Sequence, residues 1–153
     1  MKVAVASDHA GLVLKNKILE YLKKRGVEFE DMGTYECTSV DYPDFGEKVA
    51  LAVAEGGFDK GICICGTGVG ISIAANKVPG VRAALCHDTF SARYSREHND
   101  ANILCMGERV IGFGSAMDIV DIWLYTEFAG DRHAERVEKI TQIEKKYSKK
   151  PKE

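Results

Sequence analysis

The sequence lacks the features that mark membrane proteins, nucleic-acid-binding proteins and disulfide-rich proteins. No stretch approaches the roughly 20 apolar residues that span a bilayer, and the first apolar residues meet Asp8 and His9 too soon to form a signal peptide. The formal net charge of -2 offers no excess of positive charge to a phosphate backbone. The five cysteines include no C-x-x-C pair, which favours reduced thiols over disulfides or a zinc site. We therefore expect a cytoplasmic protein that binds neither nucleic acid nor a membrane.

The 153 residues suit a single domain, expected over residues 1–147, with a polar, lysine-rich tail at 148–153. Five short apolar runs alternate with longer amphipathic stretches, as is typical of a parallel sheet covered by helices on both faces. The runs occupy residues 3–7, 27–31, 61–65, 82–86 and 102–106. The pattern predicts an α/β fold: a flavodoxin-like, Rossmann three-layer sandwich with a five-stranded parallel sheet of order 2-1-3-4-5 and an extra C-terminal helix.

The amphipathic stretches carry the spacing of helices. Apolar residues within 14–22 share one helical face, and Gly26 follows where a helix-ending glycine is expected. A second helix is predicted from apolar residues that repeat at helical spacing within 45–53, with Pro43 suited to its first turn. The stretch 115–128 is apolar nearly all round, so we expect that helix to be buried.

The last predicted helix, at 132–147, has a narrow apolar stripe on an otherwise charged surface. The stripe consists of Val137, Ile140, Ile143 and Tyr147. Because both faces of the sheet already have their covering helices, we expect the stripe to pack on a partner subunit, in a homodimer or a dimer of dimers with shared sites.

Ligands of such sheets bind beyond the carboxyl ends of the strands, at the switch point between strands one and three. Asp8 and His9 follow the first strand, and the loop from Cys65 to Gly70 follows the third. An N-cap role for Asp8 and a surface position for the His9 imidazole are the simpler alternatives, but the position of the two residues favours a functional interpretation.

The loop CGTGVG alternates glycine with other residues at the start of a helix, where free N–H groups can hold an anion. It is not the dinucleotide fingerprint, because Ile71 stands where the third glycine belongs, and no Walker lysine follows. Cys65 precedes the helix, where a thiolate is favoured, so it is a candidate base. Thr67 could donate its hydroxyl to the same anion or could serve only in the turn.

Other reactive residue types have weaker support from the residues alone. Four cysteines are interpreted as structural, in the core or in a loop: Cys37, Cys63, Cys86 and Cys105. His87 is also interpreted as structural. His98 ends a helix before the fifth strand and is expected at the sheet's carboxyl edge or just outside it. Arg132 and Arg136 lie one helical turn apart and could converge on one phosphate, although such a pair is more often a solvated face.

The chain resembles the ribose-5-phosphate isomerase B family, within the group that also contains the galactose-6-phosphate isomerase subunits. The similar segments span almost the whole chain. They are SDHAG at 7–11, SVDYPDF at 39–45, CGTGVGISIAANK at 65–77, SREHNDANIL at 95–104, GERVIG at 107–112 and GDRHAERV at 130–137. One departure is Gly130-Asp131, where many relatives have Gly-Gly, and a carboxylate there could weaken phosphate binding by Arg132.

The resemblance implies an isomerase that interconverts ribose 5-phosphate and ribulose 5-phosphate through an enediol, without a cofactor or a metal. It implies that Cys65 is the proton acceptor, that Thr67 helps to stabilise the anion and that His98 opens the furanose ring. The implied substrate-binding residues are Asp8, His9, Gly66, Thr67, Gly68, Val69, Gly70, Asn99, Arg109, Arg132 and Arg136.

Two alternatives remain open from the sequence. A hexose 6-phosphate, such as allose or galactose 6-phosphate, could replace the pentose. The fold alone would also permit a flavodoxin-like nucleotide-binding or flavin-binding module, although such a module would not need a cysteine and a histidine at strand ends.

Overall fold

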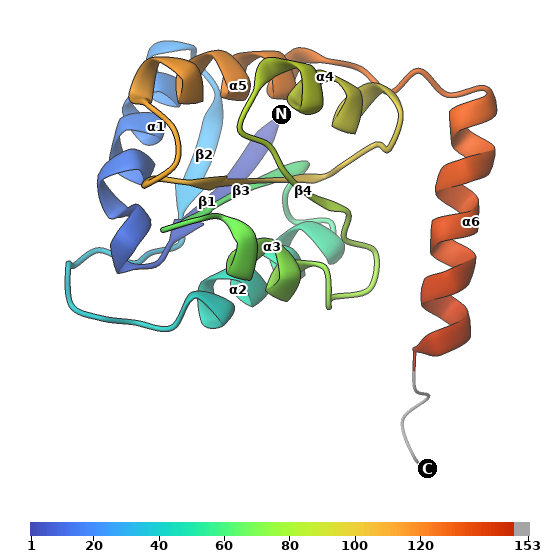
Figure 1. Cartoon of the computed structure of the whole chain (residues 1–153), viewed down its shortest axis with the longest axis horizontal. Helices are drawn as coiled ribbons and strands as arrows, with labels where there is room; N and C mark the ends of the chain where they lie inside the picture. Colours follow the sequence, from blue (N-terminus) through green and yellow to red (C-terminus); the bar gives the residue numbers. More distant parts are fainter. Residues whose placement is uncertain (149–153) are drawn as a thin grey trace.

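The computed structural model describes residues 1–148, in which strands and helices alternate along the chain (Figure 1). The strands are β1 (Lys2–Ser7), β2 (Glu28–Asp31), β3 (Lys60–Cys65), β4 (Ala83–Leu85) and β5 (Ile103–Gly107). The helices are the 3-10 helix η1 (His9–Gly11), α1 (Leu12–Lys24), α2 (Tyr42–Ala54), α3 (Val69–Ala75), α4 (Thr89–Glu97), α5 (Phe113–Tyr125) and α6 (Arg132–Tyr147). The five predicted strands are confirmed, and so are the predicted helices. Of the predicted tail, only Ser148 lies within the described residues.

The sheet is entirely parallel, as predicted, but the order of its last two strands differs from the prediction. The observed order is β2-β1-β3-β5-β4, not 2-1-3-4-5. The reason lies in the burial of the two strands: all five residues of β5 are buried, whereas the three residues of β4 are partly exposed. The longer, fully apolar strand takes the inner place with two neighbours, and the short one lies at the edge. The switch point between β1 and β3 is unaffected.

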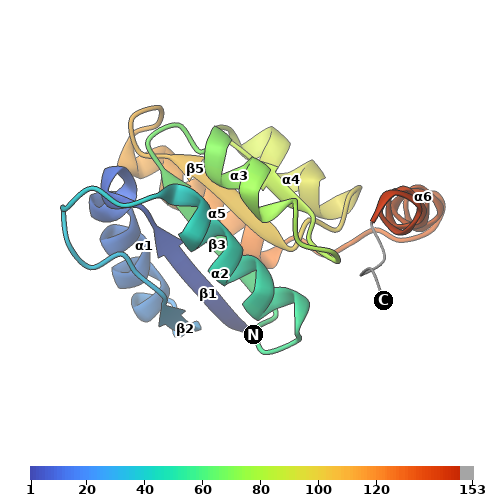
Figure 2. The same ribbon diagram turned by 90° about the horizontal axis from the view of Figure 1, so that it is seen from below.

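Helices cover both faces of the sheet, giving the predicted three layers (Figures 1 and 2). On one face, α1, α4 and α5 pack around Trp123, which is fully buried as expected for its helix. On the other, α2 and α3 pack on a second cluster that includes Cys63, Cys65 and Cys105. None of the helices within residues 1–148 combines the length and the hydropathy needed to cross a membrane.

The last helix, α6, stands away from the sheet and its covering helices (Figures 1 and 2). Three residues of its apolar stripe are exposed: Ile140, Ile143 and Tyr147, at 45%, 59% and 72%. Ile140, Ile143 and Tyr147 line one wall of a groove of about 550 Å³, whose other wall includes Pro79 and Val81. The stripe is therefore left largely uncovered by the rest of its own chain, as the sequence predicts.

His87 completes the hydrogen bonding at the carboxyl end of β5. The edge strand β4 stops at Leu85, so it offers no carbonyl to the N–H of Gly107; His87 Nε2 accepts that hydrogen bond instead, at 3.0 Å. The neutral ring must then carry its proton on Nδ1. Burial lowers the pKa of His87 below its ordinary value, which favours the neutral form that can accept. The structural interpretation of His87 agrees with this contact.

This contact predicts that stability falls in acid. The unfolded chain protonates His87 near its ordinary pKa of about 6.5, whereas the folded chain resists protonation, so the contribution is intact above that pH and is lost as the pH falls through the lower folded pKa. In His87→Gln, a neutral amide can accept the same N–H. We expect the free energy of unfolding, measured by denaturant titration at pH 7.5 and 5.5, to fall less in the variant than in the wild type. Equal falls would contradict the role of His87.

Candidate functional site

A cavity of about 280 Å³ opens at the carboxyl edge of the sheet, where β1, β3 and β5 end. Its walls come from the loops after these three strands and from the start of α2. The lining residues are Asp8, His9, Ala10, Tyr42, Cys65, Gly66, Thr67, Gly70 and Arg109. The structure thus brings together the two loops that the sequence places at the switch point.

Asp8 and His9 shape one wall of the cavity through contacts of their own. The Asp8 carboxylate accepts hydrogen bonds from the N–H groups of Ala10 and Gly11, at 2.9 and 3.1 Å, so it is an N-cap as well as a lining residue. His9 Nδ1 accepts from the N–H of Val40 at 3.1 Å, which leaves the proton of the neutral ring on Nε2. His9 therefore presents a donor to a ligand while it ties down the loop before α2.

Cys65 ends β3 and is nearly buried, at 4% exposure, with its side chain at the cavity. Its sulfur accepts a hydrogen bond from the N–H of Gly68 at 3.1 Å. An N–H that points at sulfur stabilises negative charge there, as a proton-abstracting thiolate requires. Gly68 has φ of 75°, and a Cβ on it would lie 2.7 Å from the Met106 backbone, so only glycine allows this geometry.

The remaining residues of the glycine loop divide between the turn and the cavity. Thr67 Oγ1 accepts from the N–H of Val69 at 3.2 Å, which is turn chemistry, while the hydroxyl proton stays free to donate toward the cavity. Gly66 and Gly70 line the cavity directly. Gly68 lies buried behind the loop and Val69 begins α3, so these two predicted binding residues shape the loop and are not part of the cavity wall.

Arg109 brings a positive charge to the cavity from the segment after β5. The backbone N–H groups of Glu108 and Arg109 donate to the carbonyls of Cys65 and Gly66, at 3.0 and 3.1 Å, so this segment runs along the glycine loop. A Cβ on Gly66 would lie 3.4 Å from Arg109 Nη1, so the guanidinium passes close to the loop. The site therefore places one cation beside the glycine loop, an arrangement suited to an oxyanion.

Tyr42 is a cavity residue that the sequence reasoning does not identify. It is the first residue of α2, and a Cβ on Gly70 would lie 2.6 Å from its ring. Its place depends on the preceding loop, which is held at the end of β1: the Ser7 N–H donates to the carbonyl of Gly33, and the Thr34 N–H donates to the carbonyl of Ser7, each at 2.7 Å. The available signal was its position in the segment SVDYPDF, directly before the helix-starting Pro43.

The other predicted site residues lie at the opposite edge of the sheet. His98 and Asn99 follow α4 and precede β5, and a helix that joins parallel strands must return to their amino ends. The expectation that His98 lies at the carboxyl edge is therefore wrong. Gly61, which donates to the carbonyl of Asn102 at this edge, lies four residues from Cys65, so roughly 13 Å of strand separates the edges.

Arg132 and Arg136 join His98 at this second location. The His98 ring stacks on the buried ring of His133, with centroids 4.1 Å apart and planes inclined by 9°. Burial, the neighbouring His98 and the two arginines lower the pKa of His133 below its ordinary value, which favours the neutral form of this ring. His133 was not identified from the sequence, although it lies within the segment GDRHAERV. The first turn of α6 thus faces the end of α4.

The unusual Asp131 adopts a backbone conformation that favours glycine. Its φ is 45°, and the preceding Gly130 has φ of 68°. Glycine would adopt this conformation without strain. The Asp131 carboxylate lies beside Arg132, and the two residues line a small hollow of about 300 Å³.

Within residues 1–148, no three His, Cys, Asp or Glu side chains gather in a way that could hold a metal ion. What the cavity offers is a thiol, N–H donors, a hydroxyl and a guanidinium. Such a set can accept a proton and stabilise a developing negative charge.

Comparison with known proteins gives matches along nearly the whole chain. The ribose/galactose isomerase family model matches residues 3–140. Ribose-5-phosphate isomerase B of Escherichia coli is 52% identical over 145 residues, which cover 95% of this chain and 97% of that protein. The solved ribose-5-phosphate isomerase B of Clostridium thermocellum superimposes with a TM-score of 0.95 at 64% identity, covering 97% of this chain and 100% of the other.

A third match includes a ligand. The structure of ribose-5-phosphate isomerase B from Mycoplasma genitalium with bound ribulose 5-phosphate superimposes with a TM-score of 0.91 at 43% identity, covering 94% of this chain and 96% of the other. The resemblance seen in the sequence segments is thus confirmed over both sequence and fold. The chain is a sugar-phosphate isomerase, and it belongs to the ribose/galactose isomerase family.

Proposed function

We propose that this protein interconverts ribose 5-phosphate and ribulose 5-phosphate, with Cys65 as the base. The observation that carries the proposal is the nearly buried Cys65 thiol, which accepts a hydrogen bond from the Gly68 N–H and lines the cavity with Thr67 and Arg109. The relatives named for ribose 5-phosphate, and the one with bound ribulose 5-phosphate, support the choice of a pentose. The unpaired cysteines suit a reducing compartment such as the cytoplasm.

The reaction moves one proton between adjacent carbons. In the open-chain aldose, the Cys65 thiolate removes the proton on C2, and the electrons of that C–H bond form a C1–C2 double bond while charge moves to the carbonyl oxygen. A proton then moves from the C2 hydroxyl to the C1 oxygen, and the proton held by Cys65 returns to C1 as the C2 carbonyl forms, which gives the ketose and restores the thiolate. A positioned base of this kind contributes about 10²–10⁴-fold. The loop N–H groups, the Thr67 hydroxyl and Arg109 stabilise the enediolate oxygens; one such donor contributes about 10²–10³-fold.

Ring opening and phosphate binding need the second group of residues. His98 opens the furanose by moving protons between the ring oxygen and the anomeric hydroxyl, and Asn99, Arg132 and Arg136 hold the phosphate end. Within one chain this group faces away from the cavity, across the sheet. We propose that a second copy of the chain brings its own His98, Asn99 and arginines to the cavity, giving a homodimer with two shared sites. The uncovered apolar stripe of α6 supports such an arrangement.

The choice of substrate is tested by a turnover panel. We expect the highest kcat/KM for ribose 5-phosphate, the substrate for which the similar proteins are named, and lower values for allose 6-phosphate and galactose 6-phosphate. A higher kcat/KM for a hexose 6-phosphate would overturn the pentose assignment.

Cys65→Ala should lower kcat by at least about 10²–10⁴-fold, because it removes the base. Cys63→Ala, two residues earlier on β3 and also buried, is the matched control and should retain most of the activity. Iodoacetamide should inactivate the protein, and substrate should slow the inactivation. The exposed Cys37 would also react, so this measurement uses a Cys37→Ser background. Near wild-type kcat in Cys65→Ala would remove the thiolate from the mechanism.

His98→Asn should damage the turnover of cyclic substrates selectively. Ribose 5-phosphate is mostly a furanose and needs its ring opened, whereas a four-carbon aldose 4-phosphate cannot close a strain-free ring. We therefore expect the loss in kcat/KM to be larger by about tenfold or more for the pentose, the lower end of what a general acid–base group contributes. Steady-state kinetics on both substrates measures this, and equal losses would contradict the ring-opening role.

Subunit mixing tests the shared site. A hybrid of Cys65→Ala and Arg132→Ala chains has one doubly damaged site and one intact site. Random re-pairing makes about half of the dimers hybrid, so two inactive variants should together recover about a quarter of wild-type activity. Mass spectrometry of the intact dimer confirms the exchange. If complete exchange restores no activity, each site is built within a single chain.

A further inference from the structure

We propose that Arg96 is a positioning residue that joins the turn bearing His98 and Asn99 to the segment that leads to Arg132 and Arg136. These four side chains would then meet the substrate as one unit. The inference rests on the proposed function of those residues and adds a residue that does not itself touch the substrate.

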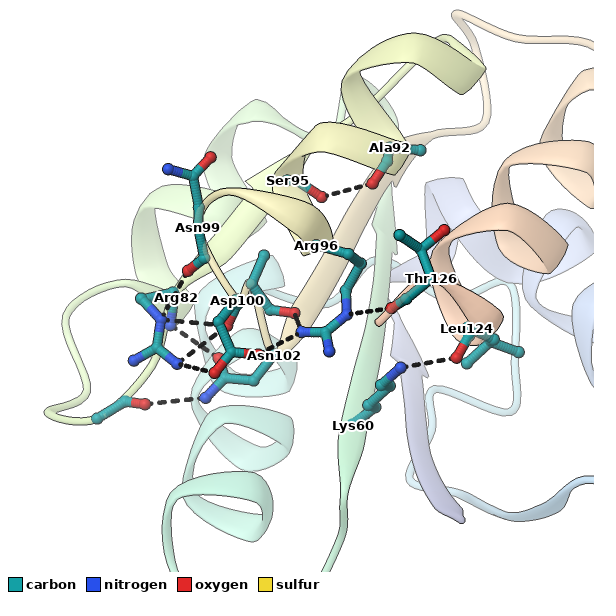
Figure 3. Close-up of polar contacts among 12 residues, drawn as sticks. Lys60, Arg82, Ala92, Ser95, Arg96, Asn99, Asp100, Asn102, Leu124 and Thr126 are labelled. Carbon is teal, nitrogen blue, oxygen red and sulfur yellow. Dashed lines mark hydrogen bonds and ion pairs between the residues drawn. The ribbon is translucent and has the colours of Figure 1, made fainter. Parts of the chain in front are cut away.

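Arg96 lies under the turn and is 7% exposed (Figure 3). Its Nη1 donates to Asp100 Oδ1 at 2.8 Å and to the carbonyl of Ala101 at 2.6 Å. Its Nε donates to the carbonyl of Thr126 at 3.3 Å, just after α5. One rigid guanidinium therefore bridges two chain segments that are about 25 residues apart in sequence, 100–101 and 126.

The turn held by Arg96 has a backbone that needs support. Asp100 has φ of 46°, which is uncommon for a residue with a side chain. The Asp100 carboxylate also forms an ion pair with a second arginine, since Arg82 Nη2 lies 3.3 Å from Asp100 Oδ2. Arg82 also donates to the carbonyls of Asn99 and Asp100. Two guanidiniums thus hold the residues directly after His98 in place.

The other end of the bridge leads into α6. After Thr126, the N–H of Ala129 donates to the carbonyl of Glu97 at 3.0 Å. The stack of His133 on His98 then fixes the first turn of α6. Because α6 stands away from the sheet, this short link sets where Arg132 and Arg136 lie relative to His98 (Figure 1). Arg96 is the side chain that ties the link to the turn.

Lys60 provides a matched control in the same region. Like Arg96 it lies near the Trp123 ring, at 5.3 Å from the ring centroid for Lys60 and 5.8 Å for Arg96. Its Nζ donates to the carbonyl of Leu124, at the end of α5, at 2.7 Å (Figure 3). Its hydrogen bond goes to α5 and not to the turn. Lys60→Met therefore removes a half-buried cation that packs on Trp123, while the turn and its arginines are kept.

The experiment measures kcat and KM for ribose 5-phosphate and the Ki of inorganic phosphate for each variant. In Arg96→Met we expect KM and the phosphate Ki to rise about tenfold. The substitution would displace the substrate-binding side chains, and a displacement of such a group by about 1 Å costs up to about 10²-fold in rate or binding. In Lys60→Met both should stay within about twofold. A merely structural loss would reduce the fraction of active molecules, lowering kcat while KM and Ki stay the same.

Two further variants keep the test decisive. Arg96→Lys keeps the charge but cannot serve both segments with one ammonium group, so KM and Ki should still rise; full recovery would overturn the bridging role. If Arg96→Met does not fold, Asp100→Asn tests the same turn, since asparagine tolerates positive φ while the paired carboxylate is lost. It too should raise KM and Ki, and unchanged values would overturn the proposal.

Arg132→Ala separates this inference from the proposed function. If Arg132→Ala leaves KM and the phosphate Ki unchanged, the proposed phosphate site is wrong. If Arg132→Ala raises both and Arg96→Met raises neither, the proposed function stands and the positioning role of Arg96 is wrong.

Discussion

The close approach of backbone to backbone at the carboxyl ends of β1, β3 and β5 is the constraint on which the candidate site depends. A Cβ on Gly11 would lie 2.8 Å from the backbone of Ile64, and one on Gly107 would lie 2.5 Å from that of Thr67. Gly68 meets Met106 in the same way. With three segments packed at such distances, the loop after Cys65 has little room to move, and the Gly68 N–H stays directed at the sulfur. A donor held in place in this way avoids reorganisation when charge develops.

The parallel sheet imposes the division of the candidate residues into two groups. Each helix that follows a strand returns to the opposite edge, so residues at strand ends and residues at helix ends cannot meet in one chain. Cys65 and Arg109 belong to the first kind, His98 and Asn99 to the second. In the proposed shared site a second copy supplies the second group, and the separate α6 with its exposed stripe is suited to contact it. In this arrangement the hydrogen bonds of Arg96 hold the helix-end residues together. At the other edge, Gly11, Gly68 and Gly107 allow the segments that carry the strand-end residues to pack closely.

The secondary-structure elements and the chemistry of the Cys65 loop could be predicted from local sequence. Alternating apolar runs and helical faces determine the elements, because each pattern has its own period: the five strands and α6 appear where the periodicity places them. A buried apolar run that ends in Cys65 and is followed by a glycine loop indicates an anion site at the switch strand. The cavity lies at this end of that strand. These features depend on contacts within a few residues or on the general geometry of parallel sheets.

What only the tertiary structure decided depends on contacts between distant segments. The inner place of β5 goes with the complete burial of its residues, whereas β4 at the edge is partly exposed. This difference in burial between the two strands appears only once the sheet is assembled. Tyr42 reaches the cavity because a loop is pinned to β1, and His98 lies at the far edge because α4 runs back along the sheet. The sequence by itself determined the elements and the chemistry of the Cys65 loop, since both are local. The side of the sheet on which each group lies is set by long-range packing, which no local pattern records.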